Sequence, residues 1–280
     1  MSKINVFGGT GFIGKRFCGM YPQDVIVSAR DRTEPLSSNI LYLISTTHNY
    51  NDMDVDIETN ILWLSKVLKD TKKCMDRYKQ PFTFNFISSW FVYGYVSLPA
   101  KEDEPIKPRL GYYTNTKVLA EKLVMRFCSD NNINWRIFRL ANVFGIGDKF
   151  SKQKNALQYL INEMRYNRPI SLYYGGNFVR DYIHVNDVCS ALYQGMLHLP
   201  TNDIYNIGSG IPIRFKDIIF MARTLLGSSS DITLLQDAPE FHNKVSEKDF
   251  WMDISKAKKY GIFNNSSPYE KLVRMLLDED

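Results

Sequence analysis

The chain has 280 residues, of which 44% are hydrophobic, and a formal net charge of +5. A chain of this length and apolar content can bury a sizeable core, in one large domain or in a core domain with a smaller partner. The modest positive charge argues against a dedicated nucleic-acid-binding protein and suits an anionic small ligand such as a polyphosphate.

Nothing in the sequence indicates a secreted or membrane protein. No apolar run approaches the length of a membrane span, and the first expected strand begins at residue 3 or 4, without room for a signal peptide. The four cysteines are scattered, without the paired spacing of a zinc site or a redox motif. We therefore expect a cytoplasmic protein with reduced thiols, no membrane partner and no metal.

In chain order, short apolar strands alternate with helical patterns over the first half. The patterns predict strands at 4–7, 25–28, 41–45, 82–88 and 135–140, and helices at 12–19, 55–68 and 111–128. The segment 30–40 is too short and too polar for a further strand-helix unit, so we expect an abbreviated sheet there. Alternation of strands and helices predicts a parallel sheet.

Beyond Gly147 the pattern loosens into a helix near 155–166, a strand at 170–173 and a glycine turn at 175–176. We expect an α/β fold in which residues 1–148 form a Rossmann-type doubly wound parallel sheet, joined later by a strand and a helix near 181–207. Residues 149–280 would form mainly a smaller C-terminal substrate-binding lobe. Because ligands of open parallel sheets bind at the carboxyl ends of the strands, we expect the site between the lobes.

A glycine-rich turn follows the first strand and opens the first helix. Its glycines have the spacing that lets the backbone approach a pyrophosphate and aims the helix N-terminus at it. The simpler alternative is an ordinary strand-to-helix turn. The expected cofactor contacts here are Gly8, Gly11, Phe12, Ile13 and Gly14.

The end of the second strand is expected to set the cofactor preference. A carboxylate there would bind the ribose hydroxyls of NAD, whereas an arginine would pair with the extra phosphate of NADP. Ala29 holds the expected carboxylate position, and Arg30 and Arg32 follow it, with Asp31 between them. The sequence therefore favours NADP(H) and leaves NAD(H) open. In the alternative interpretation the two arginines form a solvated loop edge.

Tyr113 and Lys117 stand four residues apart in the helix predicted at 111–128, so both side chains lie on one face. A phenol with a pKa near 10 exchanges protons poorly at neutral pH unless a cation stabilises its phenolate, and Lys117 is placed to be that cation. Ser89, at the end of an upstream strand, would hold the reacting oxygen. The neighbouring Tyr112 has no lysine one turn later. Together with the glycine turn, these residues indicate hydride transfer to or from a sugar nucleotide.

Two further segments carry candidate binding residues. Arg180 precedes an expected strand and is a candidate diphosphate clamp; the alternative is a pair with Asp181 or Asp187 that braces the lobes. His184 is interpreted as a structural hydrogen-bonding residue, since no second metal-type ligand accompanies it. Trp90 and its aromatic neighbours could stack on a base or a sugar or belong to the core.

With these features in place, the chain resembles the extended short-chain dehydrogenase/reductases, specifically the NAD-dependent epimerase/dehydratase family that acts on nucleotide sugars. The resemblance covers nearly the whole chain. It rests on motifs in the same order: the glycine turn, Ser88-Ser89 before Gly94, Tyr113 with Lys117 and Glu121, and the segments 139–145, 180–185 and 206–210.

The resemblance implies roles for particular residues and a homodimer formed through a helix bundle. The helices at 55–68 and 118–127 have the apolar breadth to form that bundle, although the same breadth could be satisfied inside one subunit. The implied catalytic residues are Ser89, Tyr113 and Lys117, and the last two would also touch the cofactor. Ser88 and Asn60 are implied as further neighbours of the cofactor. The implied substrate contacts are Ser89, Trp90, Asn142 and Arg180, with Lys244 as a weak substitute for the late arginine of the family.

The chain departs from the 4,6-dehydratases of this family, which carry an Asp-Glu pair where Trp90 and Phe91 stand, so dehydration is disfavoured. Our first hypothesis is NADPH-dependent reduction of a 4-keto-6-deoxy nucleotide sugar, with Tyr113 as the proton donor. The second is C4 epimerisation with tightly held NAD(H). The third is a catalytically idle nucleotide-binding scaffold, against which the intact Ser89, Tyr113 and Lys117 argue. The sequence leaves the base and the sugar open.

Overall fold

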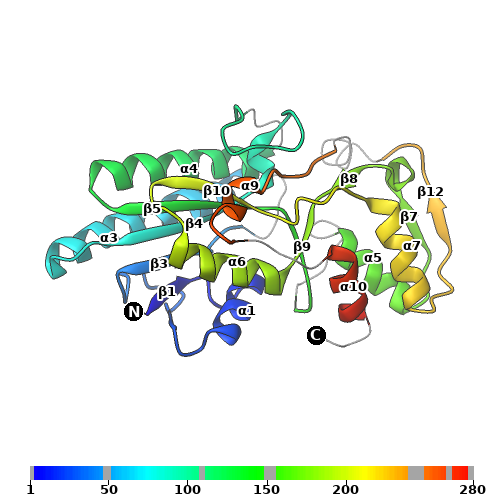
Figure 1. Ribbon diagram of the computed structural model, residues 1–280, viewed down its shortest axis with the longest axis horizontal. Coiled ribbons are helices and arrows are strands. Elements are labelled where there is room, and N and C mark those ends of the chain that lie inside the picture. Colours follow the sequence, from blue (N-terminus) through cyan, green and yellow to red (C-terminus); the bar gives the residue numbers. More distant parts are fainter. Residues whose placement is uncertain are drawn as a thin grey trace.

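Six parallel strands form the central sheet of the computed structural model, which describes residues 3–46, 52–106, 111–147, 156–238, 249–262 and 267–276 (Figure 1). The sheet has the order β10-β5-β4-β3-β1-β2. Its strands are β1 (Ile4–Phe7), β2 (Val25–Val27), β3 (Asn39–Tyr42), β4 (Thr83–Ser89), β5 (Asn134–Leu140) and β10 (Asp203–Ile207). The order reverses on either side of β1, as in a doubly wound fold.

Helices cover both faces of this sheet, because consecutive side chains of a strand point to opposite faces. On one face Val6, Leu41 and Phe138 pack against α1 (Phe12–Met20) and α6 (Val185–His198). On the other face Phe84 and Phe86 pack against α3 (Leu64–Tyr78) and α4 (Gly111–Asp130). Because both faces are covered, the sequences of the strands are nearly continuous apolar runs.

A third apolar cluster, besides those on the two faces of the sheet, lies beyond the carboxyl end of the sheet, at the right of Figure 1. It is formed by α5 (Ala156–Arg165), α7 (Phe215–Leu225), α10 (Pro268–Leu276) and the parallel pair β7 (Ile170–Leu172) and β12 (Ile232–Leu234). Two short strand pairs connect this cluster to the central sheet. They are β6 (Asn142–Phe144) with β9 (Tyr182–His184), and β8 (Val179–Arg180) with β11 (Ile213–Arg214). The remaining short elements are α2 (Met53–Ile57), the π-helix η1 (Glu58–Trp63), the 3-10 helices η2 (Trp90–Tyr93) and η3 (Tyr173–Gly176), and α9 (Ser255–Lys258).

The expected Rossmann-type fold is confirmed, and its sheet is abbreviated at the expected place. The chain passes from β2 to β3 without an intervening helix, and β3 pairs with β1 on the side opposite to β2. After α6 the chain adds β10 to the sheet beside β5. The proposed division into residues 1–148 and 149–280 stays a prediction.

Two elements differ from their expected bounds by more than two residues at one end. The strand expected at 41–45 begins at Asn39 and ends at Tyr42, because Ser45 and Thr46 turn toward a neighbouring helix instead of pairing along the sheet. The helix expected at 55–68 runs from Met53 to Tyr78 through α2, η1 and α3. Its extension buries Thr71 and Cys74, spaced as one helix face, although the segment is mostly polar.

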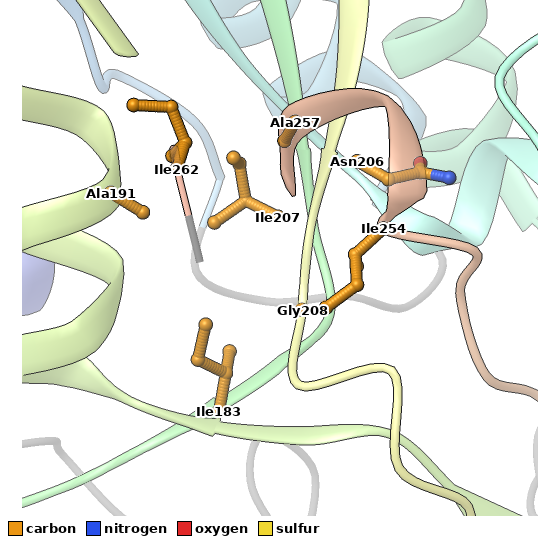
Figure 2. A pocket seen from close by; sticks show the side chains of 8 residues that line it. All are labelled: Ile183, Ala191, Asn206, Ile207, Gly208, Ile254, Ala257 and Ile262. Atoms are coloured by element: carbon orange, nitrogen blue, oxygen red, sulfur yellow. The ribbon is translucent and has the colours of Figure 1, made fainter. Parts of the chain in front are cut away.

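None of the described helices is both long and apolar enough to cross a membrane. A small apolar pocket lies where α6, β10 and α9 meet (Figure 2). Ile183, Ala191, Ile207 and Ile254 contribute to its lining, and Asn206 carries the one polar side chain among its eight lining residues. This pocket is a small gap between packed core side chains, and none of the expected site residues lines it.

Candidate active site

The glycine turn forms a cradle between β1 and α1. Gly8 has a φ of +84°, and a Cβ on Gly14 would stand 2.2 Å from the Gly8 carbonyl oxygen, so both positions exclude a side chain. Helix α1 begins after Gly11 without a side-chain cap and without an acidic residue in its first turn. Its first backbone N–H groups and its positive dipole end therefore face outward as a site for an anion. The turn fits the pyrophosphate of a dinucleotide cofactor.

The short connection after β2 is held by Asn5, a buried polar residue of β1. Its Nδ2 donates to Ser28 Oγ at 2.9 Å, and its Oδ1 accepts from the backbone N–H of Leu36 at 2.8 Å. The sequence analysis did not single out Asn5, although an amide inside an apolar strand is a signal that it bonds to something nearby. Its two contacts fix the segment that carries Arg30 and Arg32.

The two arginines of this segment differ in their partners. Arg32 donates from Nε to the Glu34 carbonyl oxygen at 2.9 Å and lies 4.0 Å from the Glu34 carboxylate. Arg30 is exposed and has no ion pair among the described residues. Both arginines are exposed, so the solvated-edge alternative stays open for both, although only the Arg30 guanidinium is without a partner in the described part of the chain.

Ser88 and Ser89 end β4 at the carboxyl edge of the sheet. Ser88 is buried, and in the part of the chain that the structure describes its hydroxyl has no hydrogen-bond partner. Ser89 is half-buried and caps η2 by accepting from the Phe91 N–H at 3.4 Å. The Ser89 hydroxyl proton is thus left to point at the phenol or at a ligand oxygen.

Tyr113 and Lys117 lie one turn apart on α4. The Tyr113 ring is half-buried and meets Phe91 edge to face, with centroids 5.9 Å apart, whereas Tyr112 is exposed. The Lys117 ammonium is buried; it donates to the Ile87 carbonyl oxygen at 2.7 Å and lies 4.3 Å from the Phe86 ring centroid. Burial lowers the pKa of Lys117 to about 8, and the charge of Glu121 partly opposes this.

The pKa of Tyr113 is raised from its ordinary value, chiefly by burial. Hydrogen bonding with the hydroxyls of Ser45 and Ser89 opposes the shift, and the charge of Asp56 adds to it. The expected lowering of the pKa by Lys117 is not seen, because the ammonium is directed at the Ile87 carbonyl. In this state of the protein Tyr113 is a protonated phenol, which is the form a proton donor requires.

Residues 43–46, which follow β3, lie between the glycine cradle and Tyr113. A Cβ on Gly8 would stand 3.1 Å from the Ile44 backbone nitrogen, and the next residue, Ser45, faces the Tyr113 phenol. The glycine cradle therefore contacts this stretch at Ile44, and Tyr113 contacts it at the next residue, Ser45. Ser45 was not among the residues chosen from the sequence; only its place beyond the carboxyl end of a strand could have indicated it.

Asn60 lies inside the π-helical turn η1 and is buried. Its Oδ1 accepts from the Thr46 N–H at 3.1 Å and from Ser45 Oγ at 3.2 Å, and its Nδ2 donates to Thr116 Oγ1 of α4 at 3.0 Å. Single π-helical turns occur frequently at functional sites, where they turn one side chain away from the regular helix face. Asn60 thus ties the loop after β3 to the helix of Tyr113.

The expected substrate contacts lie where β6, β8 and β9 meet the sheet. Asn142 donates from Nδ2 to the Asp181 carbonyl oxygen at 3.1 Å. Arg180 is buried, donates to the Val179 carbonyl at 2.8 Å and lies over the rings of Trp90 and Phe178, 5.4 and 4.7 Å from their centroids.

Trp90 belongs to the core and stacks between Phe91 and Phe250, with centroid distances of 4.2 and 4.8 Å. It therefore shapes the wall on which Arg180 rests. Lys244 lies outside the described residues.

Asp181 has a bracing role of its own, distinct from a pair with Arg180. Its buried carboxylate accepts from the N–H and hydroxyl of Ser209 at 2.8 and 2.7 Å and from the N–H groups of Gly210 and Met252 at 3.1 and 3.3 Å. Burial raises its pKa to about 6, and these donors oppose the shift. His184, interpreted as structural, caps α6 by accepting from the Asn186 N–H at 3.4 Å.

The family model described as the NAD dependent epimerase/dehydratase family matches residues 39–208. The chain belongs to this family. The resemblance inferred from the motifs is thereby confirmed.

Curated relatives include both reductases and epimerases. The chain is 27% identical over 128 residues to the dTDP-4-dehydro-6-deoxyglucose reductase of Escherichia coli, covering 46% of this chain and 40% of the relative. It is 25% identical to the ADP-L-glycero-D-manno-heptose-6-epimerase of Brachyspira hyodysenteriae, covering 81% of this chain and 82% of the relative. The alignments with four of these relatives span about half of the relative's length or less, between 38% and 51%.

Solved structures share the whole fold. The UDP-glucose 4-epimerase of Thermotoga maritima, solved with UDP-glucose, superposes with a TM-score of 0.86 at 20% identity, covering 98% of this chain and 97% of that one. The protein RMD of Pseudomonas aeruginosa, solved with NADPH, superposes with a TM-score of 0.82 at 19% identity, covering 100% and 98%. The family thus contains both of the reaction types expected from the sequence, and structures with either nicotinamide cofactor.

Proposed function

We propose that this protein is an NADP(H)-dependent oxidoreductase that reduces the keto group of a 4-keto-6-deoxy nucleotide sugar. The observation that carries the proposal is the convergence of the Tyr113 phenol and the Ser89 hydroxyl beside the glycine cradle, with the buried Lys117 ammonium one turn away. The reductase among the relatives supports the reaction. The exposed Arg30, free of ion pairs in the described part of the chain, supports the choice of NADP(H).

The cofactor would be held by the backbone of the glycine turn, with Gly8, Gly11 and Gly14 admitting the pyrophosphate and Arg30 pairing with the ribose phosphate. When bound, the reduced nicotinamide supplies a hydride. Ser89 then donates a hydrogen bond to the substrate carbonyl oxygen. Tyr113, held as a neutral phenol, gives its proton to that oxygen as charge develops on it.

Lys117 has two tasks in this mechanism. Its ammonium, whose pKa is about 8, is protonated at neutral pH, and before reaction it is held by the Ile87 carbonyl and the Phe86 ring. In this orientation it does not lower the pKa of Tyr113, so it turns from the Ile87 carbonyl toward the phenol oxygen to stabilise the phenolate that Tyr113 becomes. Arg180, seated on Trp90, is proposed to grip the diphosphate of the substrate, with Asn142 nearby.

The second candidate is C4 epimerisation with tightly held NAD(H). It is favoured by the high structural similarity to the UDP-glucose 4-epimerase of Thermotoga maritima. An epimerase regenerates its cofactor within each turnover, so it consumes none. Net consumption of reduced cofactor separates the two reactions.

The test is the absorbance of NADPH during incubation with UDP-, TDP-, GDP- and CDP-linked 4-keto-6-deoxy sugars, with NADH in parallel. We expect stoichiometric oxidation of NADPH with one nucleotide. Isomerised sugar without loss of NADPH or NADH would instead establish epimerisation. Equal dissociation constants for NADPH and NADH would refute the preference assigned to Arg30.

Adjacent tyrosines provide a matched pair of variants. Tyr113→Phe removes the proposed proton donor, and we expect kcat to fall by about 100-fold or more, the size of a general-acid contribution. Tyr112→Phe makes the same change on an exposed neighbour and should leave kcat unchanged. Full turnover by Tyr113→Phe would contradict the mechanism.

A homodimer and a cytoplasmic location are part of the same proposal. Apolar side chains are exposed along α2, η1 and α4, at Met53, Val55, Ile57, Leu62 and Leu119. Their burial against a second copy would stabilise a helix bundle. We expect a dimer in sedimentation velocity and a monomer after Leu119→Arg; an unchanged mass for the variant would argue against this face.

A further inference from the structure

The strand β2 is the outermost strand of the central sheet on the side of the glycine cradle. It pairs with β1 alone, and its last residue, Val27, has 42% of its surface exposed. In the usual dinucleotide-binding fold the first half contributes three strands, and the third lies outside the second. Here the first half ends with β2, and the next strand, β3, pairs with the other side of β1. Residues 28–38, all of them described, thus supply neither the usual third strand nor its helix.

The connection from β2 to β3 turns away from the outer side of the sheet. Thr33 donates from Oγ1 to the Asp70 carboxylate of α3 at 2.6 Å. Ser37 then donates to the carbonyl oxygen of Lys3, just before β1. The connection therefore runs along α3 back to the amino end of the sheet, and only its first turn stays at the carboxyl end of β2.

The two halves of a bound dinucleotide would extend in opposite directions from the glycine cradle. The pyrophosphate belongs at the cradle, which follows β1. Ser89 ends β4, which lies two strands from β1 on the side away from β2, so the nicotinamide extends that way. The adenosine extends toward β2, where the first turn of the connection carries the exposed Arg30. No described strand continues the sheet beyond this point.

We propose that the cofactor site is open at its adenosine end, so that the protein does not read the base and exchanges the cofactor at every turnover. The inference rests on the proposed function, because it takes the glycine cradle and Arg30 as the cofactor site. A guanidinium grips a phosphate without enclosing the base next to it. An exchangeable cofactor suits a net reductase, which has to release the oxidised form after each reaction.

The first test compares NADPH with its hypoxanthine analogue, which has a carbonyl in place of the adenine amino group. A site that hydrogen-bonds the amino group discriminates strongly against this analogue, because its buried acceptor is left unpaired. We expect the two dissociation constants, measured by nicotinamide fluorescence, to agree within about threefold, since no buried group meets the base. A larger loss of affinity would overturn the proposal.

The second test measures the exposure of the base itself. An ethenoadenine analogue of NADP⁺ carries a fluorescent base, and acrylamide, a neutral quencher, reaches that base only where solvent does. A ligand enclosed in a pocket buries about 70–90% of its surface, so an enclosed base would be strongly protected. We expect the quenching rate constant of the bound analogue to fall by less than about threefold from that of the free analogue, since one side of the base stays in solvent. Stronger protection would contradict the open site.

The two arginines of the connection give a matched pair of variants. Arg30→Ala should weaken NADPH and its hypoxanthine analogue by the same factor, about tenfold, because the phosphate and not the base is held. Arg32→Ala, whose side chain engages Glu34, should change neither dissociation constant. Unequal losses for the two cofactors in Arg30→Ala would show that the base is read.

Failure of this inference and failure of the proposed function give different results. Discrimination against the hypoxanthine analogue, with normal oxidation of NADPH by a 4-keto sugar, would refute the open site alone. Equal binding of the two cofactors without net oxidation would refute the reduction and leave the open site standing. Binding of neither NADPH nor NADH would overturn both, since the glycine cradle would then not be a cofactor site.

Discussion

A single methyl group on Gly14 should distort the glycine turn and weaken cofactor binding. The Cβ of Gly14→Ala would lie 2.2 Å from the Gly8 carbonyl oxygen, 2.8 Å from the Gly9 Cα and 2.9 Å from the Gly8 carbonyl carbon. All three are backbone atoms of the turn, so no side chain can rotate away to relieve the clash. The turn itself must shift, which moves the N–H groups that would meet the pyrophosphate.

The expected change in the free energy of unfolding of Gly14→Ala is the sum of two opposing effects. Alanine in place of glycine in a helix contributes up to about 1 kcal/mol, whereas forcing a methyl group into a packed site costs about 1–3 kcal/mol. With the full helix gain subtracted, we expect a net loss of up to about 2 kcal/mol in the free energy of unfolding of Gly14→Ala. Gly19 lies in the same helix, and a methyl group there would meet no atom of the described residues outside its own stretch of helix within 4 Å. Gly19→Ala should therefore be neutral or stabilising by up to about 1 kcal/mol.

Urea denaturation and titration of NADPH fluorescence measure the two consequences. Gly14→Ala should weaken NADPH binding at least tenfold, about 1.4 kcal/mol, and Gly19→Ala should bind as the wild type does. Wild-type affinity and an unchanged urea midpoint for Gly14→Ala would refute the assignment of the cradle. Lost affinity in both variants would indicate a general defect of α1 rather than a steric one.

Three further predictions concern charged groups. Glu121→Gln leaves the buried Arg139, which it pairs at 2.8 and 3.0 Å, without its carboxylate, and urea denaturation should show a loss of about 3–5 kcal/mol. Turnover should fall as pH rises through about 8, where Lys117 loses its proton, and Lys117→Arg should remove that limb from the pH profile; a limb at the same pH in the variant would contradict the assignment. Arg30→Ala should weaken NADPH binding by about tenfold or more and leave NADH binding unchanged, whereas Arg32→Ala, whose side chain engages Glu34, should change neither in isothermal titration.

Much of the fold was predictable because its signals are local. The apolar runs of β1, β4 and β5, the glycine turn and the long helix at 111–130 each follow from residues close together in the chain. The bounds that were missed, at β3 and at the end of α3, depend on contacts with distant segments. Thr46, for example, leaves the sheet direction to bond Asp56 and Asn60.

The residues of the candidate site also fall into those that local sequence spacing indicates and those that only the tertiary structure brings together. Tyr113 and Lys117 could be found from the sequence because a spacing of four on a helix is a local geometric fact. Ser45 and Asp56 could not, since they meet Tyr113 only when the ends of β3 and α2 are brought against α4. No periodicity relates residues that lie more than fifty positions apart.

By itself, the sequence determined the family, the parallel sheet, the place of the cofactor turn and the identity of the proposed proton donor. The tertiary structure decided the directions of side chains: Lys117 toward the Ile87 carbonyl, Arg180 onto Trp90, and Asn60 toward Asp56. The physical reason is that motifs record which groups are present and how the local backbone presents them. Burial, the direction of each hydrogen bond and the resulting pKa of Tyr113 depend on what the rest of the chain places around them.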